Sequence, residues 1–333
     1  MTMAEATESA PAARASRVWT RDVAVRATVV VLVLAAALVL AYLRADKPVI
    51  VTQAVVTGIL TGGVYGLVAM GLTLIFGVLD VVNFAHGAFL ALALFITYGV
   101  VQTTGVHPYL ALLIAVPVMF GLGWIAQYAV LNRAMGRPLE NQLLITLGFS
   151  LLIENGLLLF LGGNPHSVHF PGNRGLPVLG AVADLSRVLA FVAALVLAGV
   201  LYLILRRTRI GTAIRAVAAN RQGASLIGVD VRKIYALTFA LGTACAGAAG
   251  TLVAPFTTIQ PTAGQTFNIL AFVVVVLGGM GNVLGALAGG LLIGLTEQLG
   301  GIYLPGQSPL LLVFIVFVLV LFLRPQGLFG RSS

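Results

Sequence analysis

The sequence predicts an all-α, polytopic transmembrane bundle of about eight to ten membrane helices, and three observations lead there. Hydrophobic residues make up 59% of the 333 residues and charged residues only 9%, whereas about a quarter of a soluble domain is charged. Apolar runs repeatedly approach or exceed the about 18–20 residues that cross a bilayer as a helix. These runs do not alternate apolar and polar residues, as the strands of a membrane β-barrel do. Lipid must therefore solvate most of the surface.

The first apolar run, residues 24–43, follows an arginine-rich segment and resembles a signal peptide. Its apolar part is longer than usual and no clear cleavage site follows it, so we expect a retained helix after a cytoplasmic extension, residues 1–23. Residues 24–323 form one membrane domain, and residues 324–333 form a cytoplasmic tail. The further helices are expected at residues 50–79, 83–102, 108–131, 141–161, 188–205, 234–254, 266–279, 283–299 and 308–323. The short pair 266–279 and 283–299 forms either two spans or a re-entrant hairpin with Gly-rich breaks.

Basic residues are distributed unevenly between the connections, which is how membrane topology is encoded. The connection 206–233 holds seven basic residues and one acid, Asp230. Further basic residues lie near 132–140 and at the C-terminus, and the intervening connections hold few. We therefore expect both termini and residues 206–233 in the cytoplasm and residues 164–174 outside. Because the formal charge of +9 sits in these short clusters, we expect no nucleic-acid partner.

Two stretches interrupt the helical pattern at membrane depth, residues 83–87 and residues 278–282. Irregular backbone survives in a membrane only where protein or a water-filled cavity surrounds it, and such breaks often mark a substrate path. Asn83, His86, Gly279 and Asn282 are therefore candidate path residues. Tight turns at the membrane surface are an equal alternative. For His86 we favour a hydrogen-bonded role that fixes the turn over proton transfer.

Small residues recur every fourth position in three segments, which favours close packing of helices and indicates nothing about a substrate. The three stripes are Gly58, Gly62 and Gly66; Gly242, Ala246, Gly250 and Ala254; and Gly281, Gly285 and Gly289.

A polar stripe runs along the predicted helix 141–161. Gln142, Thr146, Ser150 and Glu154 follow at four-residue steps, so they share one broad face of the helix. A charged side chain in a bilayer is costly, and it lines an aqueous path or is neutralised by partners. The stripe is therefore expected to point away from lipid. It either lines the path or forms a hydrogen-bond network between helices.

Several kinds of chemistry are excluded by residues that the sequence lacks. A phosphate-binding loop needs a lysine after glycine, but Lys47 follows Asp46 and Lys233 follows Arg232. ATP-driven transport would therefore need a separate ATPase. His166 and His169 have no acidic residue or cysteine near them, so we expect a solvated loop there. We expect no metal, no cofactor and no catalytic residue.

The connection 206–233 also carries apolar residues, which a connection that only sets topology does not need. Residues 211–228 predict a short amphipathic helix followed by a turn, and such a helix suits docking on a cytoplasmic partner or on a membrane surface. Gly211 is expected to let the chain turn, and Ala213 and Val217 to enter a groove on the partner. The candidate coupling residues are Gly211, Arg215, Ala216, Ala218, Asn220 and Gly228.

These stretches resemble the permease subunits of ABC importers for branched-chain amino acids, most closely the H-type member of the usual H/M pair. The resemblance runs from about Gln53 to the end of the chain. Its motifs are Gly-Gly-Val-Tyr-Gly-Leu-Val-Ala-Met-Gly at 62–71, Asn-Phe-Ala-His-Gly at 83–87, Gly-Thr-Ala-Ile-Arg-Ala-Val-Ala-Ala-Asn at 211–220, Leu-Gly-Gly-Met-Gly-Asn at 277–282 and Arg-Pro-Gln-Gly-Leu-Phe-Gly at 324–330. The N-terminal extension departs from the shortest members.

The resemblance implies an importer of the prokaryotic inner membrane that works by alternating access. Its implied partners are two ATPase subunits, a companion M-type permease and an external solute-binding protein. The implied substrate is a branched-chain amino acid, although the same family includes permeases for urea and short amides. The alternative class is an ion-coupled secondary transporter that uses His86 and Glu154 as a relay. A membrane-embedded enzyme ranks last, because the sequence has no nucleophile–base or metal-ligand constellation.

Overall fold

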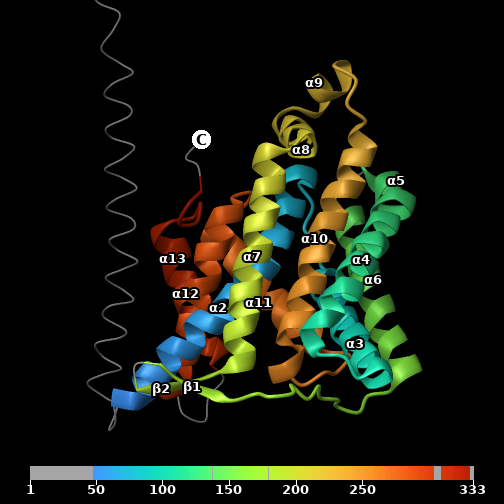
Figure 1. The fold of residues 1–333 in the computed structure, drawn as a ribbon. Coiled ribbons are helices and arrows are strands. Elements are labelled where there is room, and N and C mark those ends of the chain that lie inside the picture. Colours follow the sequence, from blue (N-terminus) through green and yellow to red (C-terminus); the bar gives the residue numbers. More distant parts are fainter. Residues whose placement is uncertain (1–47, 137, 179, 304–308, 331–333) are drawn as a thin grey trace, which may run out of the picture.

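The computed structural model describes residues 48–303 and 309–330, except residues 137 and 179. The extension 1–23 and the predicted helix 24–43 lie outside the described residues. Within the described part, seven helices are long and apolar enough to cross a membrane, and α11 and α13 are shorter apolar helices. The helices form a single bundle (Figure 1), as the sequence predicts.

Within the described residues, the predicted helices are present, with ends that differ by a few residues from the expected ones. The helices are α2 (Pro48–Leu79), α3 (His86–Thr104), α4 (Leu112–Ile125), α5 (Asn132–Ala134), α6 (Leu139–Leu161), α7 (Leu185–Arg207), α8 (Arg209–Ala219), α9 (Arg221–Leu226), α10 (Val231–Val253), α11 (Ala263–Gly278), α12 (Val283–Tyr303) and α13 (Leu310–Leu323). Short helical turns η1 (Pro108–Ala111), η2 (Ala126–Leu131) and η3 (Ala254–Phe256) extend α4 and α10.

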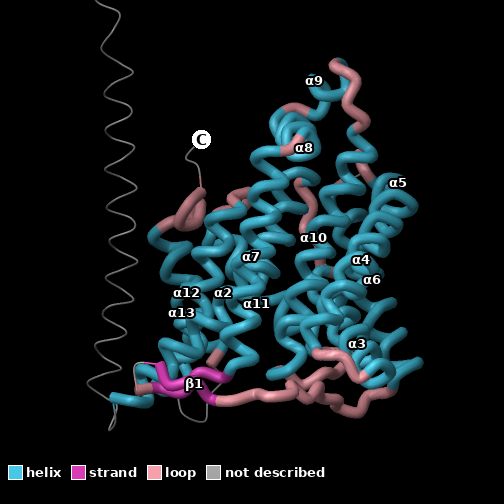
Figure 2. The backbone as a smooth tube through the Cα atoms, in the orientation of Figure 1, coloured by secondary structure: helices cyan, strands magenta, loops and turns pink. Residues whose placement is uncertain are grey.

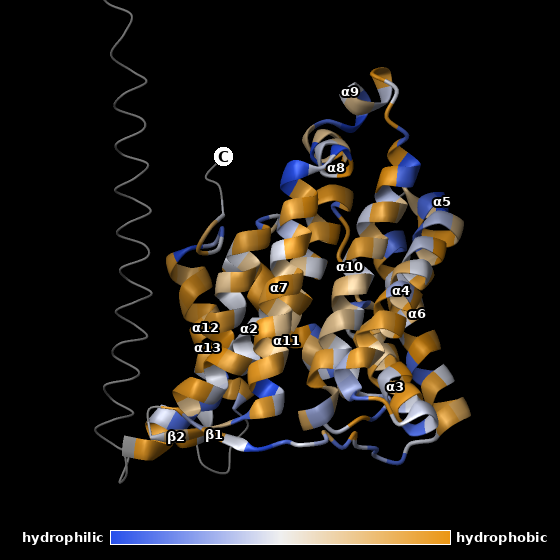
Figure 3. Cartoon of the chain, in the orientation of Figure 1, coloured by the Kyte–Doolittle hydropathy of each residue, from blue (hydrophilic) through white to orange (hydrophobic). Residues whose placement is uncertain are grey.

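The outer surface of the bundle is apolar over its middle and polar at its two ends (Figure 3). On α6, for example, Leu152 is 70% exposed and Leu159 is 79% exposed. Side chains of this kind would be unfavourable in water and suit contact with lipid or with another membrane protein.

Glycine allows the helices at the centre of the bundle to pack backbone against backbone. A Cβ on Gly62 of α2 would lie 2.8 Å from the Gly290 carbonyl oxygen of α12, and one on Gly294 would lie 2.4 Å from the Gly58 oxygen. The first predicted stripe therefore packs on a pair of glycines that no predicted stripe included. Gly285 instead meets Gly278 of α11. In all three stripes, small residues permit close approach, as expected.

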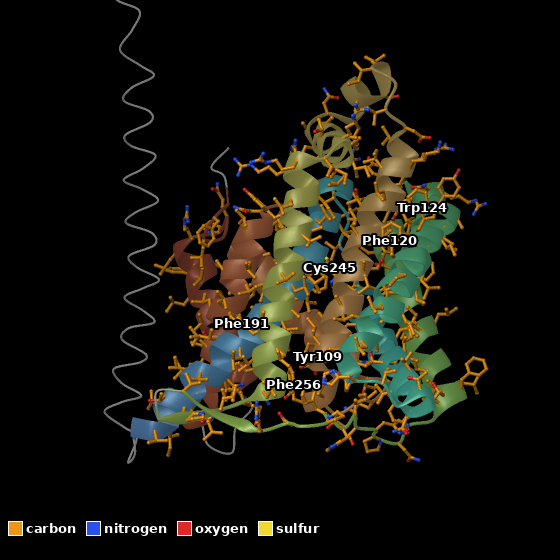
Figure 4. The ribbon with its side chains drawn as sticks, viewed as in Figure 1. Tyr109, Phe120, Trp124, Phe191, Cys245 and Phe256 are labelled. Carbon is orange, nitrogen blue, oxygen red and sulfur yellow. The ribbon has the colours of Figure 1, made fainter. Side chains whose placement is uncertain are left out.

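Larger side chains fill the space between the other helices. Phe191 of α7 lies over Gly63, where a Cβ would be 2.4 Å from its ring, and Cys245 of α10 is buried against Gly71 of α2 (Figure 4). The cysteine is therefore a small packing residue.

The two ends of the bundle carry different structures (Figure 2). Helices α8 and α9 form one end, and a hairpin of β1 (Gly175–Val178) and β2 (Ala181–Asp184) lies at the other. The sequence analysis did not predict this hairpin, because each strand has only four residues. Gln53 of α2 fixes it through two hydrogen bonds with the Val182 backbone, at 2.8 and 2.9 Å.

The segment that follows α6 is less solvated than expected. His166 pairs with Ile259 through two backbone hydrogen bonds of 2.9 Å and stacks on Tyr98, with 4.5 Å between ring centroids. His169 is exposed, in agreement with the expectation. The expectation was wrong for His166, because the partner on the loop after η3 is remote in sequence.

Candidate functional site

The first predicted break lies inside the bundle. His86 begins α3, and its Nε2 atom lies 3.0 Å from the carbonyl oxygen of Val68 on α2. Val68 precedes Leu79, the last residue of α2, by eleven positions, or about 16 Å along a helix. The chain between α2 and α3 therefore runs back into the bundle as non-helical backbone (Figure 1). It is not a turn at the membrane surface.

Local side-chain chemistry explains why the helix stops there. Asp80 has a φ of 55°, and its N–H donates to the Phe76 oxygen at 2.9 Å. A residue in the left-handed region commonly ends a helix in this way, and aspartate adopts it more readily than most residues do. Asn83 is fully buried, and its Oδ1 accepts the Ala85 N–H at 3.1 Å. This local bond competes with helical pairing and stabilises the turn.

Helix α11 packs closely against the start of α3. A Cβ on Gly87 would lie 2.1 Å from the Gly264 oxygen, and one on Gly264 would lie 2.2 Å from the Gly87 oxygen, so neither position accepts a side chain. Asn268 adds two hydrogen bonds. Its Oδ1 accepts the Gly87 N–H at 3.1 Å, and its Nδ2 donates to the Phe84 oxygen at 3.2 Å.

The polar stripe of α6 faces this same region. Thr146 is fully buried, and its hydroxyl accepts the Phe84 N–H at 3.3 Å. Gln142 is buried, whereas Ser150 and Glu154 are half-buried. Both carboxylate oxygens of Glu154 accept from Gln265 Nε2, at 2.9 and 3.0 Å. The stripe therefore points at protein, toward α3 and α11.

We call the surface formed by Phe84, Ser150, Glu154, Gln265 and Ile269 the wall. Phe84 is 38% exposed and Ile269 is 44% exposed, so this surface remains open within the single chain. It combines a carboxylate and an amide with apolar side chains in the middle of an apolar bundle. Asn83, His86 and Thr146 are fully buried.

Gln265 and Asn268 are not among the residues that the sequence predicts for this site. Their signal was two polar residues three positions apart at the start of an apolar segment. That signal is weak without knowledge of α6, which lies more than 100 residues earlier in the chain.

The second predicted break lies elsewhere, at the end of the bundle that carries α8. Gly281 lies against Gly77, in the last turn of α2. The residues after α13 cover this break. Leu328 N–H donates to the Leu277 oxygen at 2.7 Å, and Asn282 Nδ2 donates to the Phe329 oxygen at 3.1 Å. The structure therefore places Gly279 and Asn282 against the chain's own C-terminal segment, away from the wall.

The predicted docking segment is two helices rather than one. Asn220 breaks the helix with extended backbone and caps α9 by accepting the Gly223 N–H at 2.8 Å. Gly228, with a φ of 86°, provides the expected turn. Asp230 then caps α10 by accepting the Lys233 N–H at 3.1 Å, and this hydrogen bond holds the pKa of the Asp230 carboxyl below its usual value.

Two expectations about α8 were wrong. Gly211 does not turn the chain. It lies inside α8, where a Cβ would be 2.2 Å from the Leu205 oxygen, so close approach to the end of α7 requires glycine. Val217 cannot enter a partner's groove because it is fully buried in the bundle, as Ile214 nearly is.

The remaining surface of this segment is open. Arg215, Ala218 and Asn220 are exposed, and Ala216 is half-buried. Beyond them, Leu226 is 89% exposed and Ile227 is 77% exposed at the tip of α9. The sequence analysis did not single out these two residues, although two adjacent large apolar residues in a polar connection are an available signal.

Comparison with known proteins gives a consistent set of relatives. The family described as "Branched-chain amino acid transport system / permease component" matches residues 54–323. The high-affinity branched-chain amino acid transport system permease protein BraD of Pseudomonas aeruginosa is 30% identical, and the match covers 84% of this chain and 96% of the relative. The corresponding protein LivH of Escherichia coli K12 is 29% identical with the same coverage. The ribose import permease protein RbsC of that strain is 28% identical over 78% of this chain and 80% of the relative. No solved structure matches the chain.

Proposed function

Because this chain belongs to the family of branched-chain amino acid transport permease components, we propose that it is the H-type permease subunit of an ABC importer in a prokaryotic inner membrane. It is a transport subunit and not an enzyme. Two ATPase subunits, a companion M-type permease and an external solute-binding protein complete the importer. Both termini and helices α8 and α9 face the cytoplasm, and the β1–β2 hairpin faces outside.

The exposed tip of α9 is the single observation that carries this proposal. In α8, Ile214 and Val217 are buried in the bundle and Ile210 is 46% exposed, whereas Leu226 and Ile227 are far more exposed and have no cover in the described part of the chain. Two large apolar side chains in a cytoplasmic segment with many arginines would be unfavourable in water, and they fit a groove on a soluble partner. Ala218, Asn220 and Arg215 are exposed on the same segment. The Arg215 guanidinium donates to the Leu205 carbonyl oxygen and to the Thr212 hydroxyl, and its exposed face is free to pair with an acid of the partner.

The substrate enters along the wall, between this subunit and its companion. A branched-chain amino acid carries an ammonium group, a carboxylate and an apolar side chain. Glu154 offers an anionic partner for the ammonium group, and Phe84 and Ile269 offer apolar contact for the side chain. The ribose import permease among the relatives indicates that this architecture serves chemically different solutes. The wall is therefore where selectivity for an amino acid over ribose, urea or a short amide would reside.

The test is co-purification and uptake with Leu226→Glu and Ala218→Glu. Each places a charge on the proposed docking surface, so the ATPase subunits should be lost or ATP hydrolysis should no longer drive leucine uptake, while the amount of permease in the membrane is unchanged. Gln222→Glu is the matched control, because it adds the same charge at an exposed position of α9 without removing an apolar contact. Leucine uptake that persists in ATP-depleted vesicles, driven by an ion gradient and indifferent to both substitutions, would contradict the proposal and favour a secondary transporter.

A further inference from the structure

Arg221, the first residue of α9, joins the docking segment to the end of α2. Its Nη2 atom lies 2.5 Å from Asp80 Oδ2 and 3.2 Å from the carbonyl oxygen of Leu79. The guanidinium also lies over the ring of Tyr235 on α10, with 5.7 Å to the ring centroid. From the start of α9, one side chain thus contacts both α2 and α10.

Asp80 is the residue at which α2 gives way to the non-helical segment that enters the bundle. Only residues 81–83 separate it from Phe84, which belongs to the wall. Phe84 is held in turn by Thr146 of α6 and by Asn268 of α11. A chain of contacts from the docking segment to the wall therefore passes through Arg221 and Asp80.

Stability alone gives little reason for this ion pair. The Arg221 side chain is 45% exposed and the Asp80 side chain is 72% exposed, and pairs this open to solvent contribute little to folding. The pairs Arg187–Asp184 and Lys233–Asp230 join residues three positions apart, so they reinforce local structure. Arg221 and Asp80 lie 141 positions apart and connect two segments with different tasks.

We propose that Arg221 and Asp80 form the coupling link between the docking segment and the wall. When the ATPase subunits move α8 and α9, Arg221 draws Asp80 with it and displaces the segment that carries Phe84. Arg221 is a positioning residue in this account, since it reaches the substrate path only through Asp80. The inference rests on the proposed function, because it assigns the route by which the docking surface acts.

A purely structural role would make a different prediction. A cation near the last carbonyl groups of a helix stabilises the helix end, and Arg221 could do no more than that for α2. Its loss would then lower the amount of folded protein and leave the ratio of uptake to ATP hydrolysis unchanged. The ratio therefore separates the two roles.

The experiment measures leucine uptake per ATP hydrolysed by the complete complex in liposomes. Arg221→Ala and Asp80→Asn should each lower this ratio about five-fold or more, the lower end of usual coupling between sites. Both variants should retain the ATPase subunits and their hydrolysis. Asparagine also tolerates the left-handed conformation of Asp80, so the turn is kept. The double variant should be no worse than either single variant, because the two residues act as one unit. Arg221→Lys should recover part of the coupling.

Lys233→Gln is the matched control. It removes an exposed charge and an ion pair from the same segment, but that pair makes no connection to α2, so the ratio should not change. A normal ratio in Arg221→Ala, additive losses in the double variant, or a loss of folded protein in Arg221→Ala with normal coupling in Asp80→Asn would each overturn the proposal. If Leu226→Glu also leaves the ATPase bound and uptake intact, the docking assignment fails instead, which distinguishes the two failures.

Discussion

The two breaks in the helical pattern look alike in sequence, and the structure treats them differently. Each combines glycine and asparagine between apolar runs. The break at 80–87 begins at the end of α2 and reaches the level of Val68 at His86, about 16 Å back along that helix. The break at 278–282 lies at the end of the bundle, under the C-terminal residues. How deep a break lies in the bundle therefore depends on which groups pair with its freed backbone N–H and C=O groups.

The two breaks also differ in the nature of their partners. Side chains on other helices satisfy the first break, with Thr146 from α6 and Asn268 from α11. The backbone of the chain's own tail satisfies much of the second, through Leu328 and Phe329. A break held by side chains of several helices responds when those helices move. We therefore assign the first break to the substrate path and the second to structure.

The largest effect is expected from Gly87→Ala. The added Cβ would lie 2.1 Å from the Gly264 oxygen, and neither helix backbone can move away without disturbing Asn268. We expect a loss of about 1–3 kcal/mol or more from overpacking. Gly99→Ala in the same helix is the control, because nothing lies within 4 Å of its Cβ. Thermal unfolding of the purified protein in detergent measures both, and equal melting temperatures would contradict the close contact.

Asn268→Ala and Asn282→Ala compare the two breaks directly, because each substitution removes the side-chain bonds of one break. The first substitution removes both bonds that hold α3 to α11, at about 1–3 kcal/mol for the groups left unpaired, and it should lower uptake per folded complex. The second removes the bond to Phe329 and the cap on Gly285, so it should lower stability and leave uptake per folded complex unchanged. Uptake and unfolding measured on the same samples check this. Equal losses of uptake in the two variants would contradict the assignment of only the first break to the substrate path.

Glu154→Gln keeps the size of the side chain and an acceptor for Gln265, but it removes the charge. Leucine uptake should fall about ten-fold if the charge contacts the substrate's ammonium group, since a charge-assisted hydrogen bond is about twice as strong as a neutral one. The amount of assembled complex should not change. Normal uptake with normal assembly would show that Glu154 does not contact the substrate. Loss of assembly would show that its role is structural.

The smallest effect is expected from a chain that ends at Gln326. This truncation removes the bonds from Leu328 and Phe329 and uncovers Gly279, which lies against Gly330. The melting temperature should fall by a few degrees, while leucine uptake per folded complex stays the same. A truncated protein that folds normally but transports slowly would show that the second break also takes part in transport.

Much of the fold followed from local patterns. Apolar length predicted the membrane helices, the four-residue glycine spacing predicted close packing, and the polar stripe on α6 predicted a face turned toward protein. These properties depend on neighbours within one or two helical turns. The short pair of segments was correctly placed as α11 and α12 for the same reason.

The features that local patterns did not reveal depend on distant partners. Gly87 and Asn268 lie 181 positions apart, so neither residue alone indicates that α11 begins beside α3. Val217 resembles a docking residue in the sequence, because an apolar face on a short helix looks the same whether the bundle or a partner covers it. Gly211 resembles a turn residue, because the carbonyl groups of Ile204 and Leu205 that crowd it come close only once α7 and α8 pack together.

The most direct test compares the reactivity of a cysteine at each break. Phe84→Cys and Met280→Cys place thiols at positions that are 38% and 57% exposed, and the native Cys245 is buried. In the complete complex, a water-soluble thiol reagent is applied with and without ATP and leucine-loaded binding protein. We expect the labelling rate of Phe84→Cys to change several-fold between these conditions, because alternating access opens and closes the wall, and the rate of Met280→Cys to stay constant. A constant rate at position 84, or the same change at position 280, would contradict it.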